Sequence, residues 1–137
     1  MLEIKKSEQL KFCSAIFTAL INSAILSLNG TSWHVYDSNL SQTEVAVKRI
    51  TSSWGESSIT WNSQPQIGET ILTKKLGSPV LYDFDITSLT NNWLRGTQSN
   101  YGVVIMLYNE SVRQEATFHS SDISGSTQPK LTIKYRP

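Results

Sequence analysis

The sequence predicts an all-β protein, an antiparallel sandwich or barrel, with one short α-helix near residues 87–95. Two observations carry this prediction. Many short segments alternate between apolar and polar residues and are separated by turn residues, which is typical of strands with one buried face. A single segment changes to a helical period. Since the chain has 137 residues, of which 39% are hydrophobic, we expect one domain, residues 1–137, around one modest core.

The strand predictions rest on apolar side chains at every second position. In Leu81–Ile86, Tyr82 and Phe84 point one way, and Asp83 and Asp85 point the other way. The predicted strands, in chain order, are a short first strand at Leu2 and Ile4 and the segments Ala24–Leu28, Glu44–Ile50, Thr70–Thr73, Leu81–Ile86, Gly102–Tyr108, Ala116–His119 and Leu131–Tyr135.

Two of these segments carry further expectations. Asn29-Gly30 follows Ala24–Leu28, and we expect this pair to form a turn that ends the strand. Gly102–Tyr108 is apolar on both faces, which predicts a central strand that is covered on both sides.

The helical segment follows the Leu81–Ile86 strand. Leu89 and Trp93 are four positions apart and would share the buried face of about two turns. Thr87 or Ser88 would cap its first turn, and Gly96 would end it. Because so short a helix does not persist alone, packing against the sheet must hold it.

Charge content argues against two classes of partner. The net charge is +1 and only 17% of residues are charged, so no basic face can be assembled for nucleic acid or for an anionic membrane surface. Ser, Thr and Asn are abundant, which is typical of an extracellular, β-rich surface.

The run Phe12–Leu28 is similar to a signal peptide, because lysines precede an apolar stretch. Its later part contains Asn22, Ser23 and Ser27, which make it too polar for a membrane span, so no membrane insertion is predicted. The alternative that we favour is a folded segment that leads into a strand. Cys13, the single cysteine, lies in this run and is expected to be a buried, inert thiol.

Enzymatic chemistry has little support in the sequence, and we predict that the chain is not an enzyme. His34 and His119 lack the spacing of metal ligands. Asp83 and Asp85 could form a carboxylate pair for glycoside hydrolysis or for Ca²⁺, but acids on a solvated strand face are the favoured interpretation. No cofactor is predicted, and a structural Ca²⁺ would have no specified site.

Five motifs follow one another along the chain: V-x-R-I-T-S-S-W-x-E-S-x-I-T-W-N-x-Q-P (Val47–Pro65), F-D-I-T-S-L-x-x-x-W-L-x-G (Phe84–Gly96), N-Y-G-V-V-I (Asn100–Ile105), A-T-F-H-S-S-D (Ala116–Asp122) and P-K-L-T-I-K-Y (Pro129–Tyr135). In order and spacing they resemble the DNRLRE domains of bacteria and archaea, which are named for a disaggregatase-related repeat. The resemblance covers about residues 10–135.

The resemblance implies a jelly-roll β-sandwich within a secreted or surface protein. Some members of that family are carbohydrate-binding modules, and others have no known ligand. The sequence departs from the family pattern before Leu10, where the N-terminal strands are shortened. Either the sequence is truncated, or Leu2-Glu3-Ile4 replaces a strand, or another chain completes the sheet. An open sheet edge would favour pairing with a second copy or with another protein.

The aromatic residues divide into two groups. We expect Trp54, Trp61 and Trp93 to be structural, together with Asn62. Trp61 would pack on one end of the sandwich, and the Asn62 side chain would bond backbone groups in its turn.

The second group contains the candidate ligand-binding residues, because exposed aromatic rings stack on sugars and polar side chains bond hydroxyl groups. Its members are Trp33, Tyr36, Arg95, Tyr101 and Arg113. The leading functional hypothesis is a non-catalytic binding or adhesion module with polysaccharide as its ligand. The alternative is a structural module of a surface layer, spore coat or virion appendage that pairs with other protein chains.

Overall fold

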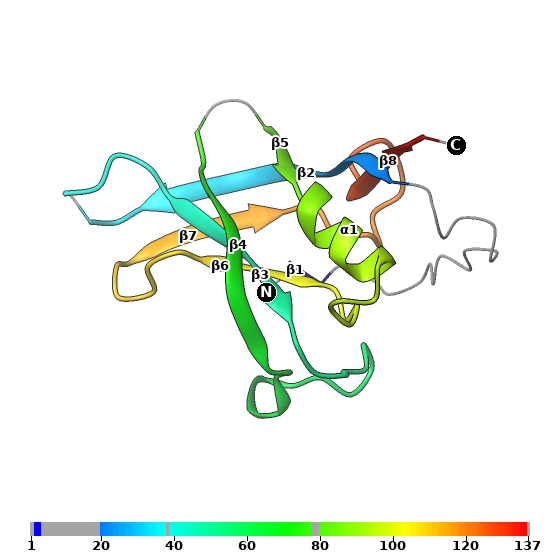
Figure 1. Cartoon of the computed structure of the whole chain (residues 1–137). Coiled ribbons are helices and arrows are strands. Elements are labelled where there is room, and N and C mark those ends of the chain that lie inside the picture. Colours follow the sequence, from blue (N-terminus) through cyan, green and yellow to red (C-terminus); the bar gives the residue numbers. More distant parts are fainter. Residues whose placement is uncertain (1, 4–19, 38, 78–79, 137) are drawn as a thin grey trace.

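The computed structural model describes residues 2–3, 20–37, 39–77 and 80–136. Two antiparallel sheets face each other, and one short helix lies beside the long strand β2 (Figure 1). This architecture confirms the predicted all-β sandwich with a helix near residues 87–95. Ile4, Cys13 and the run Phe12–Ala19 lie outside the described residues, so the expectations for them stay predictions.

Four strands form each sheet. The first sheet has the order β1-β6-β3-β4, with β1 at Leu2–Glu3, β6 at Val103–Leu107, β3 at Glu44–Ile50 and β4 at Ile67–Lys75. The second sheet is built around β2 (Ile21–Val35), which pairs with β5 (Leu81–Asp85), β7 (Gln114–Phe118) and β8 (Lys130–Tyr135). A single turn of 3₁₀ helix, η2 (Trp61–Ser63), lies in the loop between β3 and β4.

The core lies between the sheets and contains the alternating residues expected from the sequence. Its buried members are Ile21, Ala24, Leu26, Leu28, Val45, Val47, Leu76, Tyr82, Phe84, Ile86, Leu89, Val103 and Ile105. Val104 points to the other face of β6 and is only 2% exposed, which agrees with the prediction that both faces of this strand are covered.

The predicted turn at Asn29-Gly30 is wrong, because β2 runs straight through it. An added Cβ at Gly30 would lie 2.9 Å from Cε2 of Tyr82, so glycine is needed there for close packing and not for a turn. Just after Gly30 the register with β7 shifts, and Ser32 pairs with Thr117. This bulge lets one strand pair with β5 and β8 in its first part and with β7 in its last part.

Helix α1 (Thr87–Leu94) begins on a carboxylate. Asp85 Oδ1 accepts hydrogen bonds from the backbone N–H of Thr87 at 2.9 Å and from its hydroxyl at 2.6 Å. The sequence predicted that Thr87 or Ser88 would cap the helix, and this expectation is wrong. The side chain that bonds the first turn is Asp85. The helix ends at Leu94, and Gly96 follows with a φ of 71°, as predicted.

The same helix closes the start of β2. The Thr87 hydroxyl accepts the backbone N–H of Ala24 at 2.9 Å. Asn91 accepts from the Ile21 N–H through Oδ1 at 3.0 Å and donates to the Ile21 carbonyl through Nδ2 at 2.9 Å. These side chains supply the hydrogen bonds that a neighbouring strand would otherwise give to the first residues of β2.

We predict that Asp85→Asn lowers the free energy of unfolding by about 1 kcal/mol at neutral pH, the usual cost of losing a capping carboxylate. Hydrogen bonds from the Thr87 hydroxyl and then from its N–H hold the pKa of the Asp85 carboxyl below its ordinary value. A lowered pKa stabilises the fold above the unfolded-state pKa of about 3.9, and this stabilisation is lost as pH falls through the folded value.

The difference between wild type and Asp85→Asn should therefore disappear in acid, which urea unfolding across a pH series measures. Asp83→Asn on the same strand is the matched control. Asp83 accepts from the Ser27 hydroxyl, a bond that water can replace, so a smaller change is expected. An equal loss in both variants would contradict a specific capping role for Asp85.

Candidate functional site

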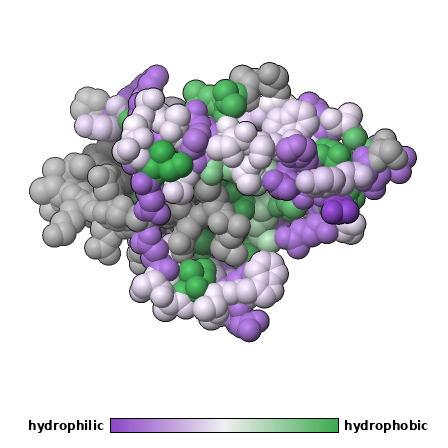
Figure 2. All heavy atoms as spheres, turned by 180° about the vertical axis from the view of Figure 1, so that it is seen from behind, coloured by the Kyte–Doolittle hydropathy of each residue, from purple (hydrophilic) through white to green (hydrophobic). Residues whose placement is uncertain are grey.

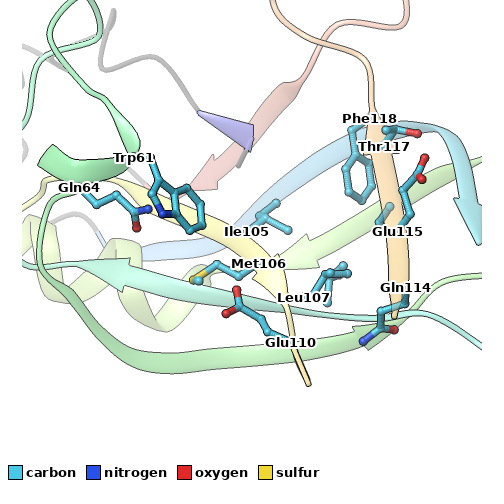
Figure 3. A pocket seen from close by; sticks show the side chains of 12 residues that line it. Trp61, Gln64, Ile105, Met106, Leu107, Glu110, Gln114, Glu115, Thr117 and Phe118 are labelled. Carbon is cyan, nitrogen blue, oxygen red and sulfur yellow. The ribbon is translucent and has the colours of Figure 1, made fainter. Parts of the chain in front are cut away.

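A groove of about 430 Å³ runs along β7 between the two sheets. Figure 3 shows Trp61 and Gln64 on one side and the side chains of β7 on the other. Ile105, Met106 and Leu107 of β6 lie between them. The groove thus combines an apolar floor with a few amide and carboxylate groups, which is the usual composition of a small-ligand site.

The loop between β3 and β4 carries Trp61, and backbone and hydroxyl groups fasten its two ends together. The Thr51 N–H donates to the Gln66 carbonyl at 2.9 Å. The Gln66 N–H donates back to the Ser52 hydroxyl at 2.8 Å. Pro65 is buried beside them. The loop therefore leaves the sheet and returns to it at a fixed point.

An ion pair lies at the base of the same loop. Arg49 Nε donates to Glu69 Oε1 at 2.9 Å, and Gln98 Nε2 donates to the same oxygen at 3.2 Å. The hydrogen bond from Arg49 lowers the pKa of the Glu69 carboxyl below its ordinary value. Since Glu69 is half exposed to water, we assign this pair a positioning effect and little stability.

Trp54 fastens the middle of the loop to the sandwich. Its indole Nε1 donates to the Tyr101 carbonyl at 2.7 Å, and the side chain is half-buried. This is the packing that the sequence predicted for Trp54. Trp93 also packs against the core from helix α1.

The expectation for Trp61 is wrong. Its side chain is 82% exposed, and no residue of the 3₁₀ turn Trp61–Ser63 is buried. The turn is closed locally by Thr60 and Ser63, because Ser63 Oγ accepts the Thr60 N–H at 2.8 Å and bonds the Thr60 hydroxyl at 2.9 Å. The side chain that bonds a backbone group of the turn is therefore that of Ser63 and not, as the sequence predicted, that of Asn62, which is exposed. A turn that closes on itself needs no contact from the indole.

Exposure of this indole has an energetic cost. A tryptophan can bury about 150–250 Å² of surface, so leaving most of it in water forgoes roughly 3–5 kcal/mol. Figure 2 shows that hydrophobic residues occur in small patches among polar ones on the rear face of the molecule. Because folding gains little from an indole that is mostly exposed, ligand binding explains the position of Trp61 beside the groove better than folding does.

Three of the candidate ligand residues lie at one end of the β2–β7 pair. Trp33 lies opposite Ala116 in the register, and the Tyr36 N–H donates to the Arg113 carbonyl at 3.0 Å. The Arg113 guanidinium lies 4.8 Å from the centre of the Tyr36 ring. The Tyr36 ring is therefore partly covered by this cation. Trp33 is 39% exposed and lines a second hollow.

Arg95 and Tyr101 lie apart from this group. Arg95 follows the last residue of helix α1 and is exposed. Tyr101 is half-buried where the chain enters β6, and its carbonyl holds Trp54. Neither residue is among the described residues that line the two hollows. The structure does not bring all five candidates together.

Sequence reasoning missed the groove residues Gln64, Met106, Glu110 and Phe118, as well as the exposure of Trp61. One signal was available for Trp61. Its neighbours Thr60, Asn62 and Ser63 are all polar, which gives an indole no apolar partner within its own turn. The other groove residues come from three distant segments, and no local pattern joins them.

Catalytic and metal chemistry find no further support in the described residues. Asp85 caps the helix, and Asp83 accepts from the Ser27 hydroxyl at 2.5 Å. Among the residues that the structure describes, no three His, Cys, Asp or Glu side chains come together as a metal site requires. In that part of the chain, no helix is long and apolar enough to cross a membrane.

A two-sheet sandwich with an apolar groove and an exposed indole at its rim defines a β-sandwich binding module. The chain belongs to carbohydrate-binding module family 96, whose family model matches residues 3–135. Comparisons with curated proteins and with solved structures gave no match. Family membership supports a non-catalytic, carbohydrate-binding role, and the finer resemblance to DNRLRE domains stays a prediction.

We predict that the two tryptophans of the loop differ sharply in their contribution to stability. Trp54→Phe removes the indole N–H bond to the Tyr101 carbonyl and should lower the free energy of unfolding by about 1–2 kcal/mol. Because the Trp61 side chain is 82% exposed, Trp61→Phe removes little packing and should change it by less than about 0.5 kcal/mol. Urea unfolding of both variants measures this difference. A destabilisation by Trp61→Phe as large as that by Trp54→Phe would show that the indole is a structural contact.

Proposed function

We propose that this module binds a polysaccharide chain in the groove along β7, with Trp61 as the stacking platform. The observation that carries the proposal is the exposure of Trp61 beside an apolar groove in a chain of a carbohydrate-binding family. A sugar ring presents C–H groups on its faces and hydroxyl groups around its edge. An indole face covers the C–H groups, and nearby polar side chains bond the hydroxyl groups.

Polar groups are suitably placed for the ring edges. Gln64 lies on the same side of the groove as Trp61, and Glu110 and Thr117 also line it. An amide donates and accepts, a carboxylate accepts, and a hydroxyl does both. Together these groups offer a sugar chain hydrogen-bond partners along the length of the groove.

The platform is also pre-organised. The turn that carries Trp61 is closed by Thr60 and Ser63, and the loop is held at its ends and by Trp54. An indole has only two rotatable side-chain bonds. Little conformational freedom is therefore lost when a ligand binds, which leaves more of the contact energy available as affinity.

We further propose that the module works in a secreted or cell-surface protein and serves attachment to a polysaccharide. This setting is the one in which the DNRLRE domains that it resembles occur, and membership in a carbohydrate-binding family supports it.

A second candidate function is assembly with another protein chain. In the described part of the chain, β7 has β2 as its one strand partner. A free strand edge favours the addition of a strand from a second copy or from another protein. Light scattering over a concentration series tests this candidate, since a mass that stays monomeric would count against it.

We predict that Trp61→Ala weakens binding of the recognised polysaccharide about tenfold or more, the loss expected when an aromatic contact of a hot spot is removed. Tyr135→Ala is the matched control, because Tyr135 is 65% exposed but lies on β8, which pairs with the opposite end of β2. Affinity electrophoresis against a panel of neutral and acidic polysaccharides identifies the ligand class, and calorimetry then measures both variants.

Loss of affinity in Trp61→Ala together with wild-type affinity in Tyr135→Ala supports the proposal. Equal affinity of Trp61→Ala and wild type would remove the groove as the site. Flat responses to every polysaccharide of the panel would remove the ligand class as well.

A further inference from the structure

A second hollow, of about 470 Å³, lies beside the bulge of β2. Its apolar wall contains Trp33, Val80, Tyr82 and Phe118, and its hydroxyl groups come from Thr31, Ser32 and Thr117. Its composition matches that of the Trp61 groove, an aromatic wall with a few groups that bond hydroxyls.

The two hollows adjoin each other. Thr117 and Phe118 of β7 line both the Trp61 groove and the Trp33 hollow. One strand end is therefore the common wall of two spaces, and a partly or largely exposed indole lines each of them.

This common wall is rigid. Phe118 packs edge to face on Tyr82, with ring centres 6.2 Å apart. The Tyr82 hydroxyl donates to the Gly77 carbonyl and accepts the Gly77 N–H at 3.2 Å. Ser32 and Thr117 join their hydroxyl groups at 2.5 Å across the strands. Both hollows thus exist before a ligand arrives, which favours binding.

The bulge in β2 turns Trp33 into the hollow. Leu26 and Leu28 face the core, so strict alternation would point Trp33 away from it. Because the register shifts between Gly30 and Ser32, Trp33 pairs with Ala116, which packs against the core. Opposite residues of an antiparallel pair share one face, so the indole joins the face on which the hollow lies.

We propose that the Trp33 hollow is a second subsite for the same polysaccharide chain that occupies the Trp61 groove. This inference rests on the proposed function and adds that the ligand is a chain long enough to cross the Thr117–Phe118 wall. Because Thr117 and Phe118 line both hollows, a single chain that crosses this wall can occupy both, and we therefore assign them to one chain and not to two separate molecules. Two linked contacts strengthen each other, because once one is made the second is intramolecular.

The four tryptophans provide an internal readout. In an ¹⁵N-labelled sample each indole N–H gives one signal, which single Trp→Phe variants assign. Titration with the longest soluble fragment of the recognised polysaccharide should shift the signals of Trp33 and Trp61. The signals of Trp54, which is bonded to Tyr101, and of Trp93, whose Nε1 atom is buried, should stay in place.

Chain length separates the two subsites. For the shortest oligosaccharide that binds, we expect Trp33→Ala to change affinity by less than about twofold, whereas for the long fragment it should weaken binding by about five- to tenfold. Trp33→Tyr keeps an aromatic face and should retain most of the affinity. Thermal unfolding shows whether Trp33→Ala folds. If it does not, the shifts of the Trp33 indole signal in the wild type still test the second subsite, and Trp33→Tyr supplies a folded variant for the affinity measurement.

The outcomes are distinct for the two proposals. If Trp61 responds and Trp33 does not, at any chain length, the second subsite is wrong and the groove remains the site. If Trp33 responds and Trp61 does not, both the groove assignment and the pair of subsites are wrong. If no polysaccharide binds at all, the proposed function fails and the subsite fails with it.

Discussion

Strand β2 must find partners for the hydrogen-bonding groups of fifteen residues, and the rest of the fold follows from how it does so. Its first part lies between β5 and β8, its last part pairs with β7, and its start is completed by Thr87 and Asn91 of the helix. The helix is held by this role, since its two turns are too short to persist alone. The position of β7, which lines both hollows, depends on the same strand.

The bulge after Gly30 links this constraint to the proposed site. Without a shift in register, a single strand would keep one face toward the core along its whole length. The shift lies where the pairing of β2 passes from β5 and β8 to β7, and it brings Trp33 to the side of Ala116 and Phe118. The bulge at which the pairing of β2 changes therefore also places Trp33 in the wall of a candidate binding surface.

The loop between β3 and β4 separates stability from recognition within a few residues. Trp54 gives its N–H to the Tyr101 carbonyl and holds the loop, while Trp61 stays in water. Because Thr60 and Ser63 close the turn by themselves, the fold does not need the second indole. That separation leaves the exposed ring available for a ligand, which is what the proposed function requires of Trp61.

Four features could be predicted from the order of residues alone: the fold class, the strands with clear alternation, the helix that ends before Gly96, and the core positions of Tyr82 and Phe84. These features depend on local periodicity, which a chain carries in its own order of residues. Three features became visible only in the folded chain: β2 continues past Gly30, Trp61 is exposed, and Thr117 and Phe118 line two hollows. The path of β2 and the shared wall of the hollows depend on contacts between segments far apart in the chain, such as Gly30 with Tyr82, which no local pattern encodes. The exposure of Trp61 has a local cause, the closure of its turn by Thr60 and Ser63, but only the structure shows that closure.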